Sequence, residues 1–182
     1  IYAKQYVLLD AETSEVIVSS GADTPIPIAS TTKMTTALVA LNKLPLDKAV
    51  TISAKPPLVQ GSKIGLRAGE SITVRDLIRG LLIYSGNDAA FALAEAFANQ
   101  PGDYQRFVEE MNKFARQHYL VNTVYGDPAG LDDLTGRSTA RELANVARLL
   151  LREPFLAETV TTPELTVTSI DGQITHQFKN TN

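Results

Sequence analysis

The spacing of apolar and polar positions divides the chain into strands at both ends and helices between them. Apolar residues at every second position predict strands, and polar or glycine-containing turns separate them. The expected strands or short extended segments lie within 5–20, at 49–53 and 62–73, and at 164–170 and 173–179. Asp171–Gly172 joins the last two as a favourable hairpin turn.

In the middle of the chain, apolar residues recur every three or four positions, which is typical of helices with one buried face. The predicted helices begin near Ser30 and at Thr73, and span 88–100, 103–119 and 138–153. The third is apolar almost all round, so we expect it at the centre. The pattern predicts an α+β fold in which a helical cluster packs on an antiparallel sheet.

Composition and charge exclude several classes of function. The 182 residues are expected to form a single domain, 1–182, and the net charge of −3 without a basic run argues against nucleic-acid binding. The chain contains no cysteine, which excludes disulfides and thiolate metal ligands, and no apolar run approaches the roughly 20 residues of a membrane span. We find no signal peptide and no initiating methionine, so we expect that an upstream segment has been removed.

The first predicted helix carries a serine and a lysine one turn apart. By helical spacing, Ser30 and Lys33 share the inward-facing stripe of Met34, Ala37, Leu38 and Leu41. We expect Thr32, Thr35 and Thr36 on the other sides of this helix. Burial lowers the pKa of a lysine, and a neutral amine beside a hydroxyl can act as its general base. The alternative is an N-cap serine followed by a lysine that reaches out to solvent.

A second polar motif, Tyr-Ser-Gly-Asn at 84–87, separates two strongly apolar helices. We therefore expect this loop to lie inside the molecule, with the Ser85 hydroxyl and the Asn87 amide available as polar groups. The alternative is a simple pair of helix caps.

Together, Ser-Thr-Thr-Lys at 30–33 and Ser-Gly-Asn at 85–87 resemble the signature of the penicillin-recognising serine peptidases and β-lactamases. The contexts IASTTK and YSGNDAA are most similar to the low-molecular-mass penicillin-binding proteins, which are D-alanyl-D-alanine carboxypeptidases. The resemblance extends over nearly the whole chain and implies a β-lactamase/DD-peptidase-like fold.

The resemblance also implies roles. Ser30 would be the acylated nucleophile, Lys33 its base, Ser85 a proton relay and Asn87 a substrate-binding residue. The substrate would be the peptidoglycan pentapeptide, β-lactam antibiotics would act as inhibitors, and no cofactor or metal would be needed. Such an enzyme works outside the cytoplasm, in the periplasm or on the outer face of the cytoplasmic membrane.

One element of the family signature, Lys-Thr-Gly on a sheet strand, does not occur in the sequence. We therefore expect the domain to be incomplete at its C-terminus, and a C-terminal segment or second chain to supply that strand. Without it, the resemblance predicts weak acylation.

Other functions remain to be weighed. A Ser-His-Asp hydrolase needs a placed histidine, but we expect His118 and His176 at the surface. A carboxylate cluster at Asp127, Asp132 and Asp133 is more simply interpreted as a solvated loop. For a class A-like β-lactamase, the candidate Glu142 falls within a helix. The sequence leaves open a DD-endopeptidase and a non-catalytic penicillin sensor.

Overall fold

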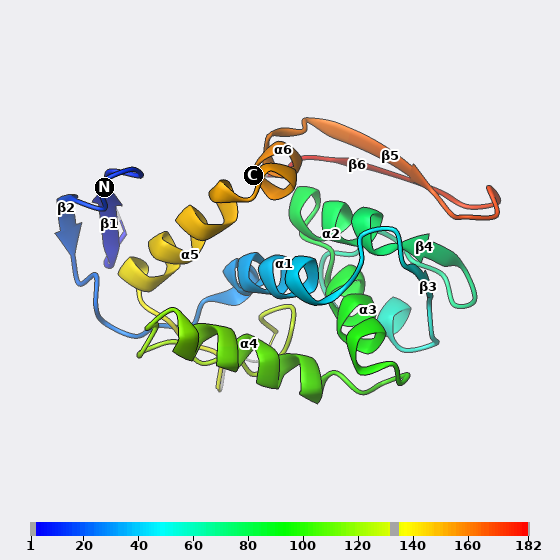
Figure 1. Cartoon of the computed structure of the whole chain (residues 1–182), viewed down its shortest axis with the longest axis horizontal. Helices are drawn as coiled ribbons and strands as arrows, with labels where there is room; N and C mark the ends of the chain where they lie inside the picture. The colour runs from blue at the N-terminus through cyan, green and yellow to red at the C-terminus, as the bar shows by residue number, and fades with distance from the viewer. Residues whose placement is uncertain (1–2, 132–134, 182) are drawn as a thin grey trace.

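The computed structural model describes residues 3–131 and 135–181, and Figure 1 shows a body of helices with strand pairs on its two sides. The helices are α1 (Thr32–Lys43), α2 (Val74–Ile83), α3 (Asn87–Ala98), α4 (Gln105–Gln117), α5 (Ala140–Arg152) and α6 (Pro154–Thr161). Two short 3-10 helices, η1 (Ala29–Thr31) and η2 (Pro56–Leu58), precede α1 and β4. The strands are β1 (Tyr6–Leu9), β2 (Val16–Ser20), β3 (Ala49–Thr51), β4 (Ser71–Thr73), β5 (Glu164–Thr168) and β6 (Thr175–Lys179).

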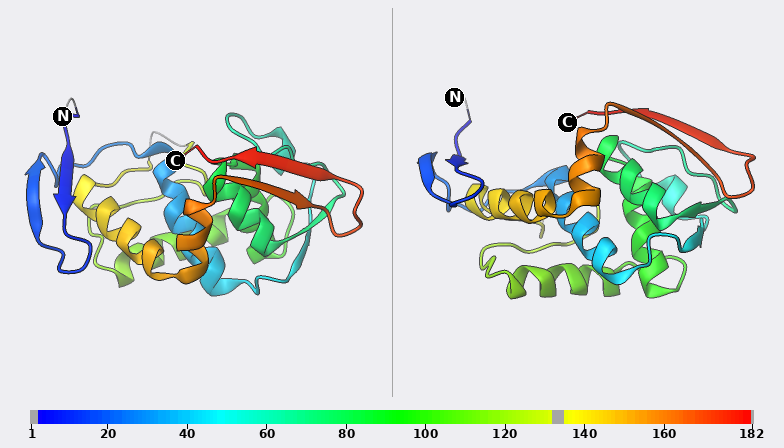
Figure 2. Two further views of the ribbon diagram at one scale, coloured as in Figure 1. Left: turned by 90° about the horizontal axis from the view of Figure 1, so that it is seen from above. Right: turned by 45° about the horizontal axis from the view of Figure 1, so that its top comes forward.

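The strands form three separate antiparallel pairs among the described residues: β1 with β2, β3 with β4, and β5 with β6. The β1–β2 hairpin packs on α5, and the β5–β6 hairpin runs across the outer side of α2 toward β4 (Figures 1 and 2). These hairpins and the α+β class are as predicted from the sequence. Gly172, with φ of 74°, forms the turn between β5 and β6.

Helix α1 lies at the centre of the helical body, in contact with α2, α3, α4 and α5 (Figure 1). The prediction of a single buried stripe on α1 is therefore wrong. The buried side chains include the three threonines assigned to its other sides: Thr32, Thr35 and Thr36. Met34 and Leu41 are only partly buried. A helix surrounded by four others buries most of its circumference, whatever its apolar pattern.

Helix α3 is also central, as its nearly uniform apolar surface predicts. Leu93 and four of its alanines, Ala89, Ala90, Ala92 and Ala94, are buried almost completely. It begins at Asn87, one residue before the expected start.

The sequence interpretation missed α6. This helix has only eight residues and begins with Pro154, which is favourable at the first helical position because the missing N–H has no partner there anyway. Leu156 is fully buried, and the guanidinium groups of Arg75 and Arg79 lie 5.6 and 5.8 Å from the centre of the Phe155 ring. Packing against α2 and α5 rather than helical periodicity holds it in place.

The outer face of the β1–β2 hairpin is apolar and open to solvent. Leu8, Ile17 and Val18 are 53%, 65% and 41% exposed. Monomeric proteins rarely leave such strand faces uncovered.

No helix in the described ranges is long and apolar enough to cross a membrane.

Helix α2 begins at the predicted capping residue. The Thr73 hydroxyl accepts the Asp76 N–H at 3.1 Å and donates to the Asp76 carboxylate at 2.7 Å. We predict that Thr73→Ala lowers the free energy of unfolding by about 1 kcal/mol, measured by urea denaturation. Thr73→Ser, which keeps the hydroxyl, should retain wild-type stability; an equal loss in both variants would contradict the capping role.

Candidate active site

Ser30 lies in η1, immediately before α1, and its side chain is exposed, not directed into the core as its helical spacing predicted. The 3-10 turn rotates it away from the stripe that α1 would continue. The preceding residue, Ala29, has φ of +44°, an uncommon conformation that costs energy outside glycine. The chain from 127 to 130 packs directly against it, since a Cβ added to Gly130 would lie 1.8 Å from the Ala29 carbonyl oxygen.

Lys33 is buried, with 3% of its surface exposed. Its Nζ donates to Ser30 Oγ at 2.8 Å and to the Ala129 carbonyl at 3.0 Å. Burial lowers the pKa of Lys33 from 10.5 to about 8, and the negative charge of Asp127 opposes that shift. The amine is therefore close to a serine hydroxyl and deprotonates far more readily than a lysine in water.

Asp127 is buried, so the expectation of a solvated loop is wrong at this position. Its Oδ1 accepts the backbone N–H groups of Ala129 at 2.6 Å and Gly130 at 2.7 Å. This turn fixes the Ala129 carbonyl that receives Lys33. The Asp-Pro-Ala-Gly sequence is typical of an Asx turn and could have indicated this role. Asp132 and Asp133, grouped with it from the sequence, lie outside the described residues.

The buried threonines of α1 hold this loop. Thr36 Oγ1 donates to the Pro128 carbonyl at 2.6 Å, and Thr35 Oγ1 lies 2.6 Å from the Tyr125 hydroxyl. Burial raises the pKa of Tyr125 to about 12, so the phenol remains neutral. These bonds keep the loop from 125 to 130 beside the first turn of α1, next to Lys33.

Ser85 lies between α2 and α3 and lines the same cleft as Ser30 and Lys33. The backbone of Ser85 is strained, with φ of +59°. Ala29, which precedes Ser30, is strained in the same way. The cleft has a volume of about 300 Å³. Its remaining walls come from Thr31, Met34, Leu81, Leu82 and Thr181.

Asn87 is buried at the start of α3, but its side chain points toward a neighbouring loop and does not line this cleft. Its Nδ2 donates to the Gln60 carbonyl at 2.6 Å, and its backbone N–H donates to the Ser62 carbonyl at 2.7 Å. Its Oδ1 has no hydrogen-bond partner in the described part of the chain. The structure thus brings Ser30, Lys33 and Ser85 together, with Asn87 two residues behind Ser85.

The two histidines differ. His118 is exposed, as expected, and contacts the Phe114 ring. His176 is 5% exposed, so its predicted surface position is wrong. Its ring nitrogens bond the Ile64 carbonyl and the Glu70 carboxylate. Both partners lie about a hundred residues earlier in the chain, so nothing in the sequence indicated the pairing.

Glu142, the candidate catalytic glutamate for a class A-like β-lactamase, is buried in α5. Its side chain points toward the loop that precedes this helix. Its carboxylate accepts the Asn122 N–H at 3.0 Å and the Thr123 hydroxyl at 2.5 Å. It stabilises that loop and is committed to these donors. Residues 3–131 and 135–181 contain no cluster of three or more histidine, aspartate and glutamate side chains suited to a metal ion.

A helical cluster with antiparallel strands at its sides is the fold that this chain shares with DD-peptidase structures. The family model for D-alanyl-D-alanine carboxypeptidase matches residues 1–182, and the chain belongs to this family.

Known relatives agree with this assignment. The chain is 38% identical over 178 residues to a D-alanyl-D-alanine endopeptidase of Pseudomonas aeruginosa, covering 97% of this chain and 56% of that one. It is 34% identical over 155 residues to the D-alanyl-D-alanine carboxypeptidase DacF of Bacillus subtilis, covering 82% and 39%. The chain thus spans about half or less of these relatives' length.

The fold is shared with the crystal structure of the Streptomyces K15 DD-transpeptidase, with a TM-score of 0.89 and 31% identity over 98% of this chain and 72% of that one. A D-alanyl-D-alanine carboxypeptidase of Mycobacterium tuberculosis gives a TM-score of 0.90 at 30% identity, covering 99% and 67%.

The pKa of Lys33 predicts how its burial affects stability. Below pH 8 the lysine is protonated in both the folded and the unfolded state, and the folded state bears the full penalty of a buried charge. Between pH 8 and 10.5 only the unfolded chain keeps the proton. The free energy of unfolding therefore rises with pH over this range. We predict that Lys33→Met raises the free energy of unfolding by about 2 kcal/mol near neutral pH. That gain should shrink as the pH rises toward 10.5.

Urea denaturation across this pH range measures the effect. Lys113→Met, on the exposed surface of α4, is the control and should show no comparable gain. A Lys33→Met gain that stays constant from pH 7 to 10.5 would show that the lysine charge carries no penalty in the fold.

Proposed function

We propose that this chain is the serine–lysine domain of a peptidase that cleaves the terminal D-Ala-D-Ala bond of peptidoglycan stem peptides through an acyl-enzyme on Ser30. The observation that carries the proposal is the 2.8 Å hydrogen bond from Nζ of the buried Lys33 to Oγ of Ser30, an exposed residue that lines the cleft. A hydroxyl open to a cleft and an amine with a lowered pKa are the two groups that acyl transfer by this route requires.

The chemistry follows from these positions. With a pKa of about 8, roughly a tenth of Lys33 is neutral at pH 7. The neutral amine takes the Ser30 proton as Oγ attacks the carbonyl carbon between the two D-alanines. The first turn of α1 places backbone N–H groups and a positive dipole end beside the developing oxyanion.

Collapse of this intermediate breaks the peptide bond. Ser85, which lines the cleft with Lys33, relays the proton from the ammonium to the departing amine of D-alanine. Water then attacks the Ser30 ester, with Lys33 again as the base, and releases the shortened peptide. We assign the substrate-amide contact to Asn87, the role that the family resemblance implies. Its Oδ1 has no hydrogen-bond partner in the described part of the chain and is the acceptor that substrate would have to reach from behind Ser85.

A β-lactam reacts at the same atoms. Its strained ring carbonyl resembles the D-Ala-D-Ala amide, so Ser30 Oγ attacks it and the ring nitrogen becomes the leaving group. That nitrogen stays tethered in the acyl-enzyme, so deacylation is slow and the drug acts as an inhibitor.

A DD-endopeptidase is the second candidate, because the 38% identical relative from Pseudomonas aeruginosa carries that name. The same residues would then cut the crosslink between two stem peptides. Turnover of a crosslinked dimer against that of a pentapeptide distinguishes the two, and absence of turnover with both indicates a penicillin sensor.

We further propose that residues 1–182 belong to a single domain whose strand side is completed by a segment carrying Lys-Thr-Gly, either later in the same protein or in a second chain. The exposed face of the β1–β2 hairpin, with Leu8 and Ile17, supports an added layer or strand there. The peptidoglycan substrate places the protein outside the cytoplasmic membrane.

The nucleophile assignment predicts a single covalent adduct. Full-length protein incubated with penicillin should gain the mass of one β-lactam, and Ser30→Ala should gain none, because it lacks the attacking oxygen. Thr31→Ala, which removes the hydroxyl of the next residue, should still be acylated, because that hydroxyl is bonded to the Ile28 carbonyl. Intact-mass spectrometry makes the measurement, and an adduct on Ser30→Ala would exclude Ser30 as the nucleophile.

The base assignment predicts the behaviour of Lys33→Arg. Arginine keeps the charge but does not deprotonate in the working range, so acylation by fluorescent penicillin should fall by about two or more orders of magnitude. In the wild type the acylation rate should rise with pH and level off above about 8, as Lys33 becomes neutral. A rate in Lys33→Arg within a few-fold of wild type would point to another base.

A further inference from the structure

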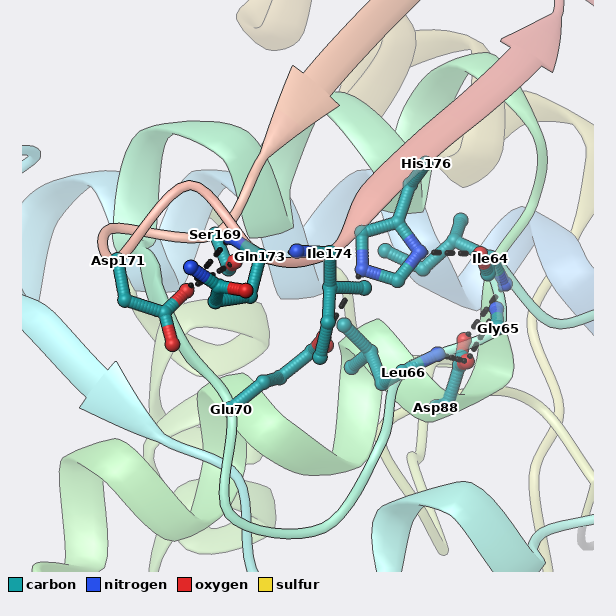
Figure 3. Close-up of polar contacts among 10 residues, drawn as sticks. All are labelled: Ile64, Gly65, Leu66, Glu70, Asp88, Ser169, Asp171, Gln173, Ile174 and His176. Atoms are coloured by element: carbon teal, nitrogen blue, oxygen red, sulfur yellow. Dashed lines mark hydrogen bonds and ion pairs between the residues drawn. The ribbon is translucent and has the colours of Figure 1, made fainter.

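A buried histidine–glutamate pair joins the β5–β6 hairpin to the loop of residues 60–70, which precedes β4 (Figure 3). His176 projects from β6 with its Nδ1 3.1 Å from the Ile64 carbonyl oxygen and its Nε2 3.1 Å from Glu70 Oε2. The two side chains are 4% and 0% exposed, so water does not replace these contacts.

A neutral histidine and an ionised glutamate cannot make both of these hydrogen bonds. One additional proton is needed on the pair. A carbonyl oxygen only accepts, so the ring nitrogen facing Ile64 carries a hydrogen. The second ring nitrogen and the Glu70 oxygen then meet either as imidazolium and carboxylate or as neutral imidazole and carboxylic acid. In both forms one proton is shared between His176 and Glu70.

The other side of the 60–70 loop is bonded to the start of α3. The fully buried Asp88 carboxylate accepts the N–H groups of Ile64, Gly65 and Leu66, each at 3.0 Å (Figure 3). Ile64 is thus held twice, with its N–H on Asp88 and its carbonyl on His176. A shift of His176 is transmitted to the first turn of α3 through a single residue, Ile64.

The same loop holds the Asn87 side chain. Gln60 and Ser62 accept its Nδ2 and backbone N–H groups, and a Cβ on Gly61 would lie 2.6 Å from Nδ2. Loop and amide therefore move together. The Ile64 side chain also packs on Gly86, where an added Cβ would lie 2.9 Å from it.

We propose that His176 and Glu70 are positioning residues for Asn87, acting through their shared proton and the 60–70 loop that they hold against α3. The inference rests on the substrate-binding role proposed above for Asn87. It assigns a function to a histidine on the last strand that takes no part in the serine–lysine chemistry.

The charged groups around the pair are already engaged. Asp88 accepts four backbone N–H groups, counting that of Ala89, and Asp171 accepts the Ser169 hydroxyl and the Gln173 N–H. The Ser169 hydroxyl and backbone donors hold the pKa of Asp171 below its usual range, so it stays ionised.

The basic groups nearby are also occupied or face solvent. On the loop, Lys63 donates to the Pro57 carbonyl and Arg67 is exposed, as is Lys179 on β6. On α2, Arg75 pairs with Asp47, and Arg79 with Asp76. The proton shared by His176 and Glu70 is therefore the one whose loss would break a hydrogen bond within this cluster.

Loss of that proton leaves two acceptors and one ring N–H. The imidazole then bonds either Ile64 or Glu70, and one contact fails. Glu70→Gln removes the competition, since the amide donates to the ring nitrogen while the opposite ring N–H stays on Ile64. This variant should keep Asn87 in place without a shared proton, whereas His176→Phe should release the loop.

The test follows the Asn87 side-chain amide by ¹H–¹⁵N NMR from about pH 6 to about pH 10, a range that spans histidine titration. The signal is assigned by its loss in Asn87→Asp. In wild type it should shift or broaden as the pH rises; in Glu70→Gln it should stay constant. His176→Phe should show the alkaline position at neutral pH, while His118→Phe, the change at the other histidine of the chain, should match wild type.

Activity gives the second readout. Acylation by fluorescent penicillin should fall about tenfold to a hundredfold in His176→Phe, as expected for a misplaced binding group, with a rise in KM for a D-Ala-D-Ala peptide. Glu70→Gln should acylate within about twofold of wild type near neutral pH and exceed it at high pH. The ratio of the two rates cancels the titration of Lys33, which both proteins share.

The outcomes separate the two proposals. If wild type is not acylated, the proposed function fails, and the NMR comparison still decides the positioning role. An Asn87 signal unchanged in His176→Phe, or a Glu70→Gln titration that follows wild type, overturns the positioning role while the acylation chemistry stands. Should His176→Phe not fold, the comparison of Glu70→Gln with wild type decides.

Discussion

The burial of one amino group is the constraint on which the site depends. Lys33 enters the core on the central helix and meets only two oxygen acceptors in its described surroundings, Ser30 Oγ and the Ala129 carbonyl. Asp127 stabilises the ammonium form by its charge, but its own Oδ1 is occupied by backbone N–H groups. Burial therefore outweighs the charge of Asp127, and the pKa of Lys33 stays near 8. A closer carboxylate would hold it permanently protonated.

Much of the scaffold is needed to maintain that arrangement. The polar side of α1 binds the loop that carries Ala129, through Thr35 and Thr36. At the start of α3, a second polar network fixes the 60–70 loop beside Asn87. Buried polar bonds of this kind are worth little on average but are costly to break, so they specify one arrangement of chain segments that apolar packing alone would leave variable.

Local features were predictable from the sequence and distant contacts were not. The Ser30–Lys33 pair, the Thr73 cap and the Asp171–Gly172 turn each depend on residues within four positions of one another. The burial of Asp127 and His176 depends on partners brought together by the fold, His176 and Glu70 being 106 positions apart. Helix α6 was missed because it is short and begins at a proline. The burial of the α1 threonines was missed because a helix in contact with four others keeps little surface open to solvent. The pattern identified the chemical groups, and packing decided which of them are buried.

The central position of α1 has a consequence for ligand binding. Four helices contact α1, so Lys33 cannot change its place without a rearrangement of the whole core. The Lys33 amine is therefore held in place beside Ser30 before any ligand arrives, and orienting it costs nothing on binding. Under the proposed function, adaptation to peptides of different shape falls to the strand side of the cleft, which the proposed Lys-Thr-Gly segment would complete. The reaction would then be a fixed property of the helices, and substrate choice could change through the strands without disturbing Ser30.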